Sequence, residues 1–205
     1  MDEVTCGPTV GRRVARMLNP SNPLALIYRI NAQDRITYVN PAWSDFARAN
    51  QGEAVMPEQV LGLSLLEFVD DPTVQQLYGA MIKRARAGRP VRFKYRCDAP
   101  DRRRTFEMDI RQLDNGEVEF ISALRHEEVR PAVTVLRAGA PHDNRLLRVC
   151  SWCQQVALPD YTWVPVEVAV QRLGLLENET FPRLTHGICQ PCRDNLEKAV
   201  IKATE

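Results

Sequence analysis

The sequence predicts an α+β fold: a five-stranded antiparallel sheet with its helices on one face, followed by a small cysteine-rich module. Segments with the two-residue alternation of strands stand at both ends of residues 22–127, and segments with helical periodicity stand between them. Four of the six cysteines lie within residues 150–192. The 205 residues leave room for two units of this kind.

The first two strands and the first helix of the sheet domain follow one another without long loops. Residues 24–30 ("LALIYRI") and 35–40 ("RITYVN") are strand-like and are separated by the turn "NAQD", which predicts a hairpin. Pro41 can open a helix, because a proline in the first turn loses no helical hydrogen bond. One face of this helix carries Trp43, Phe46, Ala47 and Asn50. After it, Gly62 is a predicted break and Ser64 a predicted helix cap.

A longer helix and three strands complete the predicted domain. The helix begins at Asp71-Pro72, ends at Gly88 and has a continuous apolar stripe formed by Val74, Leu77, Tyr78, Met81, Ile82 and Ala85. Residues 91–98, 104–113 and 117–126 are strand-like, and "DNG" predicts a hairpin between the last two. The basic run 102–104 is predicted to lie in a solvated turn.

Three segments flank this domain in the prediction. Residues 1–21 contain an amphipathic helix, with Val10, Val14, Met17 and Leu18 on one face, that is either a dimer element or a helix folded back on its own sheet. Residues 128–147 have two prolines and a glycine and no long periodicity, which indicates a linker. Residues 148–205 form the cysteine-rich module and end in a helix.

Four cysteines in the pattern C-x2-C-x35-C-x2-C predict a structural Zn²⁺ site made of Cys150, Cys153, Cys189 and Cys192. Two such pairs can complete a tetrahedron of thiolates, and an all-cysteine site has no open position for a substrate. His186 is an alternative ligand, or a hydrogen-bond donor to a thiolate. Redox chemistry would need a thioredoxin-like βαβ context, which we do not predict around either cysteine pair, and disulfides are not expected in a reducing cytosol.

Composition narrows the classes of function. The net charge of +1 suggests neither nucleic-acid nor membrane binding, and the N-terminus lacks the apolar segment of a secretory signal. We therefore expect a cytoplasmic protein. The sequence has no P-loop and no nucleophile–base pattern that would indicate an enzyme.

Residues 22–127 resemble a PAS domain, on the strength of "ALIYRINAQDRITYVNPAWSDFA" and of "FKYRCDAPDRRRTFEMDI…EVEFISAL". The resemblance implies a sensory domain that binds a small ligand between sheet and helices or signals through dimer contacts. The flavin-binding cysteine motif is missing, and the helix over residues 72–88 has no histidine for haem, so the ligand stays unknown. His126, at the end of the last predicted strand, is predicted to be solvent-exposed rather than a haem ligand.

Some residues of this domain have two interpretations. Cys97 is either a redox sensor, helped by Arg96 and Arg102, or an unreactive strand cysteine. The aromatic residues Trp43, Tyr78 and Phe106 either line a ligand cavity or belong to the core.

Residues 148–198 resemble a small cysteine-rich module that follows PAS or receiver domains in bacterial signalling proteins, on "VCSWC" and "THGICQPC". Together the two resemblances imply a bacterial signal-sensing or adaptor protein whose output passes to a protein partner or through rearrangement of a homodimer. A nucleic-acid-binding zinc-ribbon regulator and a thiol redox sensor that releases zinc are the alternatives.

Overall fold

The computed structural model describes residues 25–137, 140–175 and 178–201, with the side chains of the last two residues excepted. The predicted N-terminal helix over residues 9–18, and with it the candidate dimer element, lies outside the described residues. Within the described part, none of the helices combines the length and the apolar character that crossing a membrane requires.

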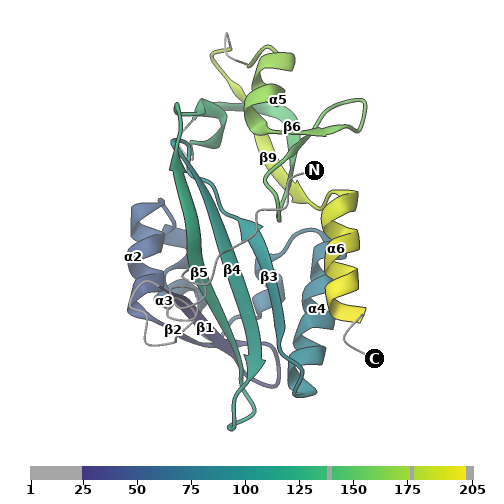
Figure 1. Ribbon diagram of the computed structural model, residues 1–205. Coiled ribbons are helices and arrows are strands. Elements are labelled where there is room, and N and C mark those ends of the chain that lie inside the picture. Colours follow the sequence, from purple (N-terminus) through teal and green to yellow (C-terminus); the bar gives the residue numbers. More distant parts are fainter. Residues whose placement is uncertain (1–24, 138–139, 176–177, 202–205) are drawn as a thin grey trace, which may run out of the picture.

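The larger sheet has five antiparallel strands, as predicted, and the structure places them in the order β2-β1-β5-β4-β3 (Figure 1). The strands are β1 (Leu26–Ile30), β2 (Ile36–Val39), β3 (Val91–Arg96), β4 (Arg102–Gln112) and β5 (Val118–Val129). Along β4 the alternation seen in the sequence is confirmed, because Phe106, Met108 and Ile110 are buried while their neighbours are only partly buried.

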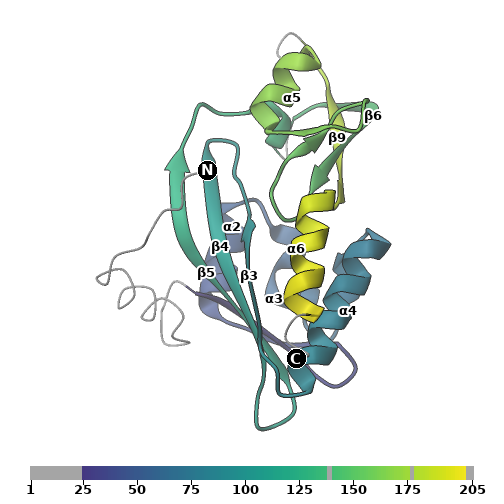
Figure 2. The same cartoon turned by 45° about the vertical axis from the view of Figure 1, so that its right-hand side comes forward.

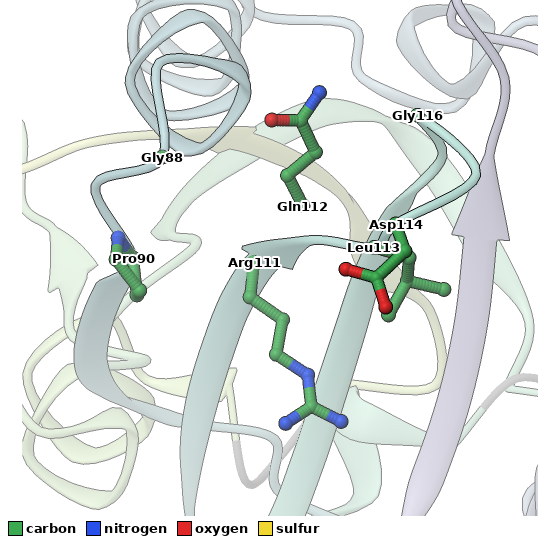
Figure 3. Close-up of a pocket in the computed structure, with 7 residues that line it drawn as sticks. All are labelled: Gly88, Pro90, Arg111, Gln112, Leu113, Asp114 and Gly116. Carbon is green, nitrogen blue, oxygen red and sulfur yellow. The ribbon is translucent and has the colours of Figure 1, made fainter.

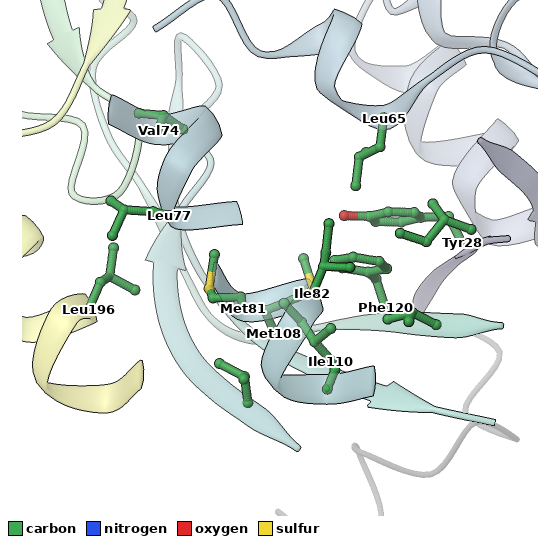
Figure 4. Packing of buried hydrophobic residues seen from close by; sticks show 14 of the residues in the cluster. Tyr28, Leu65, Val74, Leu77, Met81, Ile82, Met108, Ile110, Phe120 and Leu196 are labelled. Carbon is green, nitrogen blue, oxygen red and sulfur yellow. The ribbon is translucent and has the colours of Figure 1, made fainter. Parts of the chain in front are cut away.

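Helices cover the face of this sheet that carries the core. They are α2 (Pro41–Ala49), the 3-10 turn η1 (Glu53–Val55), α3 (Pro57–Val60), the 3-10 turn η2 (Leu65–Phe68) and α4 (Pro72–Arg86). Figure 4 shows α4 side chains such as Met81 and Ile82 packed against Met108 and Ile110 of the sheet. The structure therefore confirms an α+β architecture with a five-stranded antiparallel sheet.

Polar side chains fix where the helices begin. The Asn40 side chain caps α2 by accepting from the Trp43 N–H, and it also pairs with the backbone of Ile27 and Ala25 beside β1. Asp71 caps α4 in the same way through the N–H groups of residues 73 and 74. Ser64 precedes η2 as predicted, but its side chain makes no capping hydrogen bond.

The basic run 102–104 does not form the predicted solvated turn. β4 begins at Arg102, and the Arg104 side chain is buried, where it donates to the carbonyl of Cys97 and to Asn50 Oδ1 at 2.8 and 2.9 Å. Its guanidinium also lies over the Phe46 ring. These partners are distant in sequence, so the local charge pattern could not indicate them.

The C-terminal part forms a second, four-stranded sheet in the order β8-β7-β6-β9. Its strands are β6 (His142–Cys150), β7 (Val156–Ala157), β8 (Trp163–Val164) and β9 (Phe181–Gly187), with helix α5 (Val166–Arg172) between β8 and β9. β6 and β9 pair in parallel. The connection between these two strands runs through β7, β8 and α5, and therefore differs from the direct strand–helix–strand connection of a thioredoxin-like βαβ unit.

The predicted linker over residues 128–147 also carries structure. β5 continues to Val129, β6 begins at His142, and Val133 and Val135 are buried in the core of the second sheet. The prolines and the glycine in this segment interrupt its periodicity without preventing burial.

The last helix, α6 (Gln190–Ile201), leaves the second sheet and lies alongside α4 and the edge strand β3, as both views show (Figures 1 and 2). Leu196 of α6 is buried beside Leu77 of α4 (Figure 4). The cysteine-rich segment thus shares a hydrophobic core with the PAS-like sheet.

Candidate metal centre

The parallel pairing of β6 and β9 brings the two C-x-x-C motifs together. Cys150 is the last residue of β6 and lies opposite Gly187, the last residue of β9, and Cys189 follows two residues later. Because the carboxyl ends of parallel strands meet at one edge of a sheet, both motifs leave the sheet at the same point. Cys192 then lies in the first turn of α6.

All four predicted cysteines form one cluster, in which the sulfur atoms lie within 4.8 Å of one another. The Cys153 and Cys189 sulfurs are 3.7 Å apart. A tetrahedral Zn²⁺ site with bonds of about 2.3 Å places neighbouring sulfurs about 3.8 Å apart, so the donor set fits such an ion. The exposed fractions of Cys150 and Cys189 are 0% and 1%, whereas Cys153 and Cys192 are partly buried.

Backbone groups hold the sulfurs in place. The Cys150 N–H donates to the Gln155 carbonyl, and the Gln154 N–H donates to the Cys150 carbonyl at 2.9 Å. Gln154 adopts a left-handed conformation (φ 58°), which reverses the chain directly after Cys153. The Cys189 N–H points at the Cys150 sulfur at 3.4 Å. This N–H donation is the kind that favours a thiolate.

Hydrogen bonds within the cluster favour the thiolate form of Cys150 over that of the other cysteines. The hydrogen bond from the Cys153 thiol, together with backbone N–H groups, lowers the pKa of Cys150 from 9.0 to about 5. Because the Cys153 thiol donates this hydrogen bond and is also partly buried, the pKa of Cys153 is raised. Burial, together with the hydrogen bond to Cys189, raises the pKa of Cys192 to about 12. A bound cation would deprotonate the remaining thiols, because metal ligation requires thiolates.

His186 does not take part in the cluster. Its side chain is exposed, neither ring nitrogen lies among the clustered ligand atoms, and no hydrogen bond joins it to a sulfur within the described residues. Its backbone pairs with Val149 in the β6–β9 ladder, which places residue 186 on the strand rather than in the knuckle that follows it. The structure thus supports neither predicted role for His186.

Trp152, which stands between the first two cysteines, reaches out of the cluster into the PAS-like core. Its ring is 6% exposed and lies 5.9 Å from the rings of both Tyr78 in α4 and Phe93 in β3. Its carbonyl accepts a hydrogen bond of 2.7 Å from the Arg96 N–H at the end of β3. The indole N–H has no partner among the described residues. The first knuckle is therefore joined directly to the sheet and to α4.

A network of ion pairs makes a second connection, which the sequence did not indicate. The buried guanidinium of Arg130, the residue just after β5, binds Asp98 at 3.3 Å and Glu167 of α5 at 2.7 Å. Arg103 of β4 also binds Glu167, at 2.8 Å. Although partial burial raises the pKa of Glu167, its hydrogen bonds to Arg103 and Arg130 outweigh this and lower the pKa below 4.5.

A third connection runs from β6 to the start of α4. Arg148 pairs with Asp71, the α4 cap, at 3.0 Å. The guanidinium passes over Gly187, and a Cβ at that position would collide with it. Glycine at this position therefore leaves room for the contact between the two parts of the chain.

The remaining candidate residues of the larger domain are a cysteine, a histidine and three aromatic residues, and none of them forms a site of the kind considered from the sequence. Burial, outweighing nearby Arg104, raises the pKa of Cys97, which disfavours a reactive thiolate. His126 is exposed. Trp43 packs edge-on against Tyr28, Tyr78 against Trp152, and Phe106 against Tyr95, so these three aromatics belong to the packed core.

One pocket lies at the end of the sheet far from the cysteines. It has a volume of about 320 Å³ and lies between the end of α4 at Gly88 and the β4–β5 hairpin at Gly116 (Figure 3). Arg111 lines it, but the guanidinium is paired with the buried Glu119 at 2.7 Å.

Comparisons with known proteins assign the larger domain to a family. A family described as the PAS fold matches residues 21–127. None of the curated proteins compared with the chain matches it.

Several solved structures match a little over half of the chain. A domain of a sensory box sensor histidine kinase/response regulator from Geobacter sulfurreducens is 19% identical, with coverage of 56% of this chain and 93% of that one and a TM-score of 0.37. The PAS domain of BvgS from Bordetella pertussis is 18% identical (57% and 83%, TM-score 0.35). A sensory box sensor histidine kinase from Vibrio cholerae is 10% identical (57% and 92%, TM-score 0.35). At these identities and TM-scores, the family assignment depends on the match over residues 21–127.

Proposed function

The chain belongs to the PAS-fold family, and from this premise we propose that it is a cytoplasmic signal-sensing adaptor whose PAS domain is coupled to a structural zinc module. The domain division proposed is residues 22–127 for the PAS domain and 148–205 for the module. Output passes to a protein partner or through rearrangement of a homodimer. The insertion of Trp152 into the PAS core carries this proposal, because it links the knuckle to α4 and β3.

Zinc is proposed as the resident ion, held by Cys150, Cys153, Cys189 and Cys192. The four sulfurs match the spacing of a tetrahedral thiolate site, and thiolates favour soft or borderline ions such as Zn²⁺ over Mg²⁺ or Ca²⁺. When bound, the ion closes the two knuckles. The residues themselves do the coupling: Trp152 fixes the first knuckle to the sheet, and Leu196 fixes α6 to α4.

The first experiment measures the metal content of protein purified without chelators, by inductively coupled plasma mass spectrometry. We expect about one zinc per chain in the wild type and in Cys97→Ala, whose cysteine lies outside the cluster. Cys189→Ala should lose the metal and unfold the module. Metal-free wild-type protein, or full zinc in Cys189→Ala, would contradict the proposed site.

Coupling is tested on the same protein by hydrogen exchange. Removal of zinc with a chelator should increase exchange in α4 and β3, because both pack against Trp152 and α6. Strands β1 and β2 lie at the other end of the sheet and serve as the internal control. Increased exchange confined to residues 148–201 would leave the module without a connection to the sensor.

A second candidate function is thiol sensing. The observation that favours it is the unequal exposure of the four cysteines, because Cys153 and Cys192 are only partly buried. A charge-mixed module surface gives no comparable support to nucleic-acid binding.

A further inference from the structure

A pocket of about 520 Å³ opens between the edge strand β3 and helix α6, beside the metal centre. Both parts of the chain line it: Phe93 and Tyr95 come from β3, Trp152 and Cys153 from the first knuckle, and Cys192 from α6. Its size falls in the range of about 300–1,000 Å³ that is typical of small-molecule sites. Its walls are mainly apolar and aromatic.

The pocket reaches only half of the metal ligands. Cys153 and Cys192 line it, whereas Cys150 and Cys189 are fully buried and are not part of its lining. A molecule in the pocket therefore meets the pair formed by one cysteine of each knuckle.

We propose that this pocket is a modification site for a planar, apolar electrophile of the quinone class, and that Cys153 or Cys192 is the nucleophile. Phe93, Tyr95 and Trp152 supply aromatic surface for a flat ring, since aromatic rings pack favourably on one another. The inference deepens the thiol-sensing function and, where it concerns metal release, depends on the proposed zinc site.

The chemistry needs no oxidant besides the quinone itself. The thiolate sulfur donates an electron pair to a ring carbon of the quinone, so an S–C bond forms and a C=C π bond breaks. The displaced electron pair moves to the carbonyl oxygen, which takes a proton from water, and loss of the ring proton restores an aromatic hydroquinone. Nothing leaves the protein, and the quinone is reduced as the sulfur becomes a thioether.

Alkylation at this position opens the centre. A thioether is a much weaker ligand than a thiolate, so three thiolates are left for an ion that favours four. The adduct also occupies the space between β3 and α6, where Leu196 packs against the shared core. The modification would thus loosen the same contacts that couple the module to the sheet.

The test treats full-length protein with 1,4-naphthoquinone and follows each cysteine by peptide mass mapping. Cys153 and Cys192 should be modified about tenfold faster than Cys150 and Cys189, since susceptibility follows exposure. Asn195→Phe, at the α6 side of the pocket, should slow this reaction about tenfold by filling the space, whereas Lys198→Phe, an exposed α6 position outside the pocket lining, should not. Iodoacetamide, which is small and not planar, should react equally with both variants.

The outcomes separate this inference from the zinc proposal. First modification of Cys150 or Cys189 would overturn the pocket assignment. So would an unchanged naphthoquinone rate both in Asn195→Phe and in a second pocket-filling variant, Ala199→Phe, whose position also lines the pocket. Release of zinc to a chelating dye in step with adduct formation supports the full proposal. Protein that contains no zinc but keeps the predicted labelling order would overturn the zinc site alone.

Discussion

At the scale of single residues, the Trp152 side chain makes one favourable and one unfavourable contribution to the free energy of folding. Its ring packs between Tyr78 and Phe93, yet its N–H is buried without a partner among the described residues. An unsatisfied buried donor costs about 1–3 kcal/mol, while a buried ring of this size contributes more through packing. The packing term should therefore dominate.

Substitutions at Trp152 separate the two terms. Trp152→Phe removes the unpartnered donor and keeps a ring, so the free energy of unfolding should change by less than about 1.5 kcal/mol. Trp152→Ala should lower it by about 3–5 kcal/mol, as expected for loss of a buried aromatic side chain. Urea denaturation followed by far-UV circular dichroism measures both. Trp163→Phe, at a partly buried position in β8, is the control. Equal losses in the Phe and Ala variants would show that the indole, not the packing, matters at this position.

At the scale of elements, the sequence predicted what is local and missed what depends on pairing. Alternation over residues 104–113 identified a strand, and the spacing of the cysteines identified their cluster, because both signals lie in short stretches. The parallel pairing of β6 with β9 could not be predicted in this way, since it joins segments more than 30 residues apart whose local patterns do not name a partner. The burial of Arg104 was missed for the same reason.

The junction between β5 and α5 depends on charges that no local motif reveals. Glu167 receives hydrogen bonds from Arg103 and Arg130, one at the start of β4 and the other just after β5. Its pKa in the folded protein lies below the ordinary 4.5. A carboxyl group of this kind contributes stability above its unfolded pKa and loses that contribution as the pH falls through the folded pKa.

Glu167→Gln should therefore lower the melting temperature most at neutral pH. Below about pH 4.5 the difference in melting temperature between wild type and variant should shrink. The wild-type carboxylate becomes protonated there and is then uncharged, like the amide of the variant. Differential scanning fluorimetry from pH 7 down to pH 3.5 gives the two curves. Asp45→Asn, which removes the exposed ion pair to Arg48 on α2, is the control and should have little effect on stability at any pH. A gap between wild type and Glu167→Gln that widens on acidification would contradict the network.

At the scale of the whole molecule, one hydrophobic core extends from the five-stranded sheet into the cysteine-rich module. One cluster of buried residues contains Phe120 of the PAS sheet and Leu77 of α4 together with Cys150, Trp152 and Leu196 of the module. The second sheet has a separate core around Val156 and Val170. All four clustered cysteines pack in the first of these cores, so the candidate metal centre belongs to the core that the module shares with the PAS sheet.

This arrangement predicts that the zinc-loaded protein unfolds as one cooperative unit. Tryptophan fluorescence and far-UV circular dichroism should give the same melting midpoint, because a shared core links the two parts.

Apparent binding energies of about 10–16 kcal/mol for structural zinc equal or exceed the whole stability of a typical domain, so chelation should unfold the module first. The PAS domain should then melt at a lower temperature, since α4 and β3 lose Trp152 and α6. The Trp152→Ala variant should show the same lowered PAS transition even with zinc present. If chelation instead removes one transition and leaves the midpoint of the PAS transition unchanged, the two units are independent, and the contact through Trp152 transmits nothing between them.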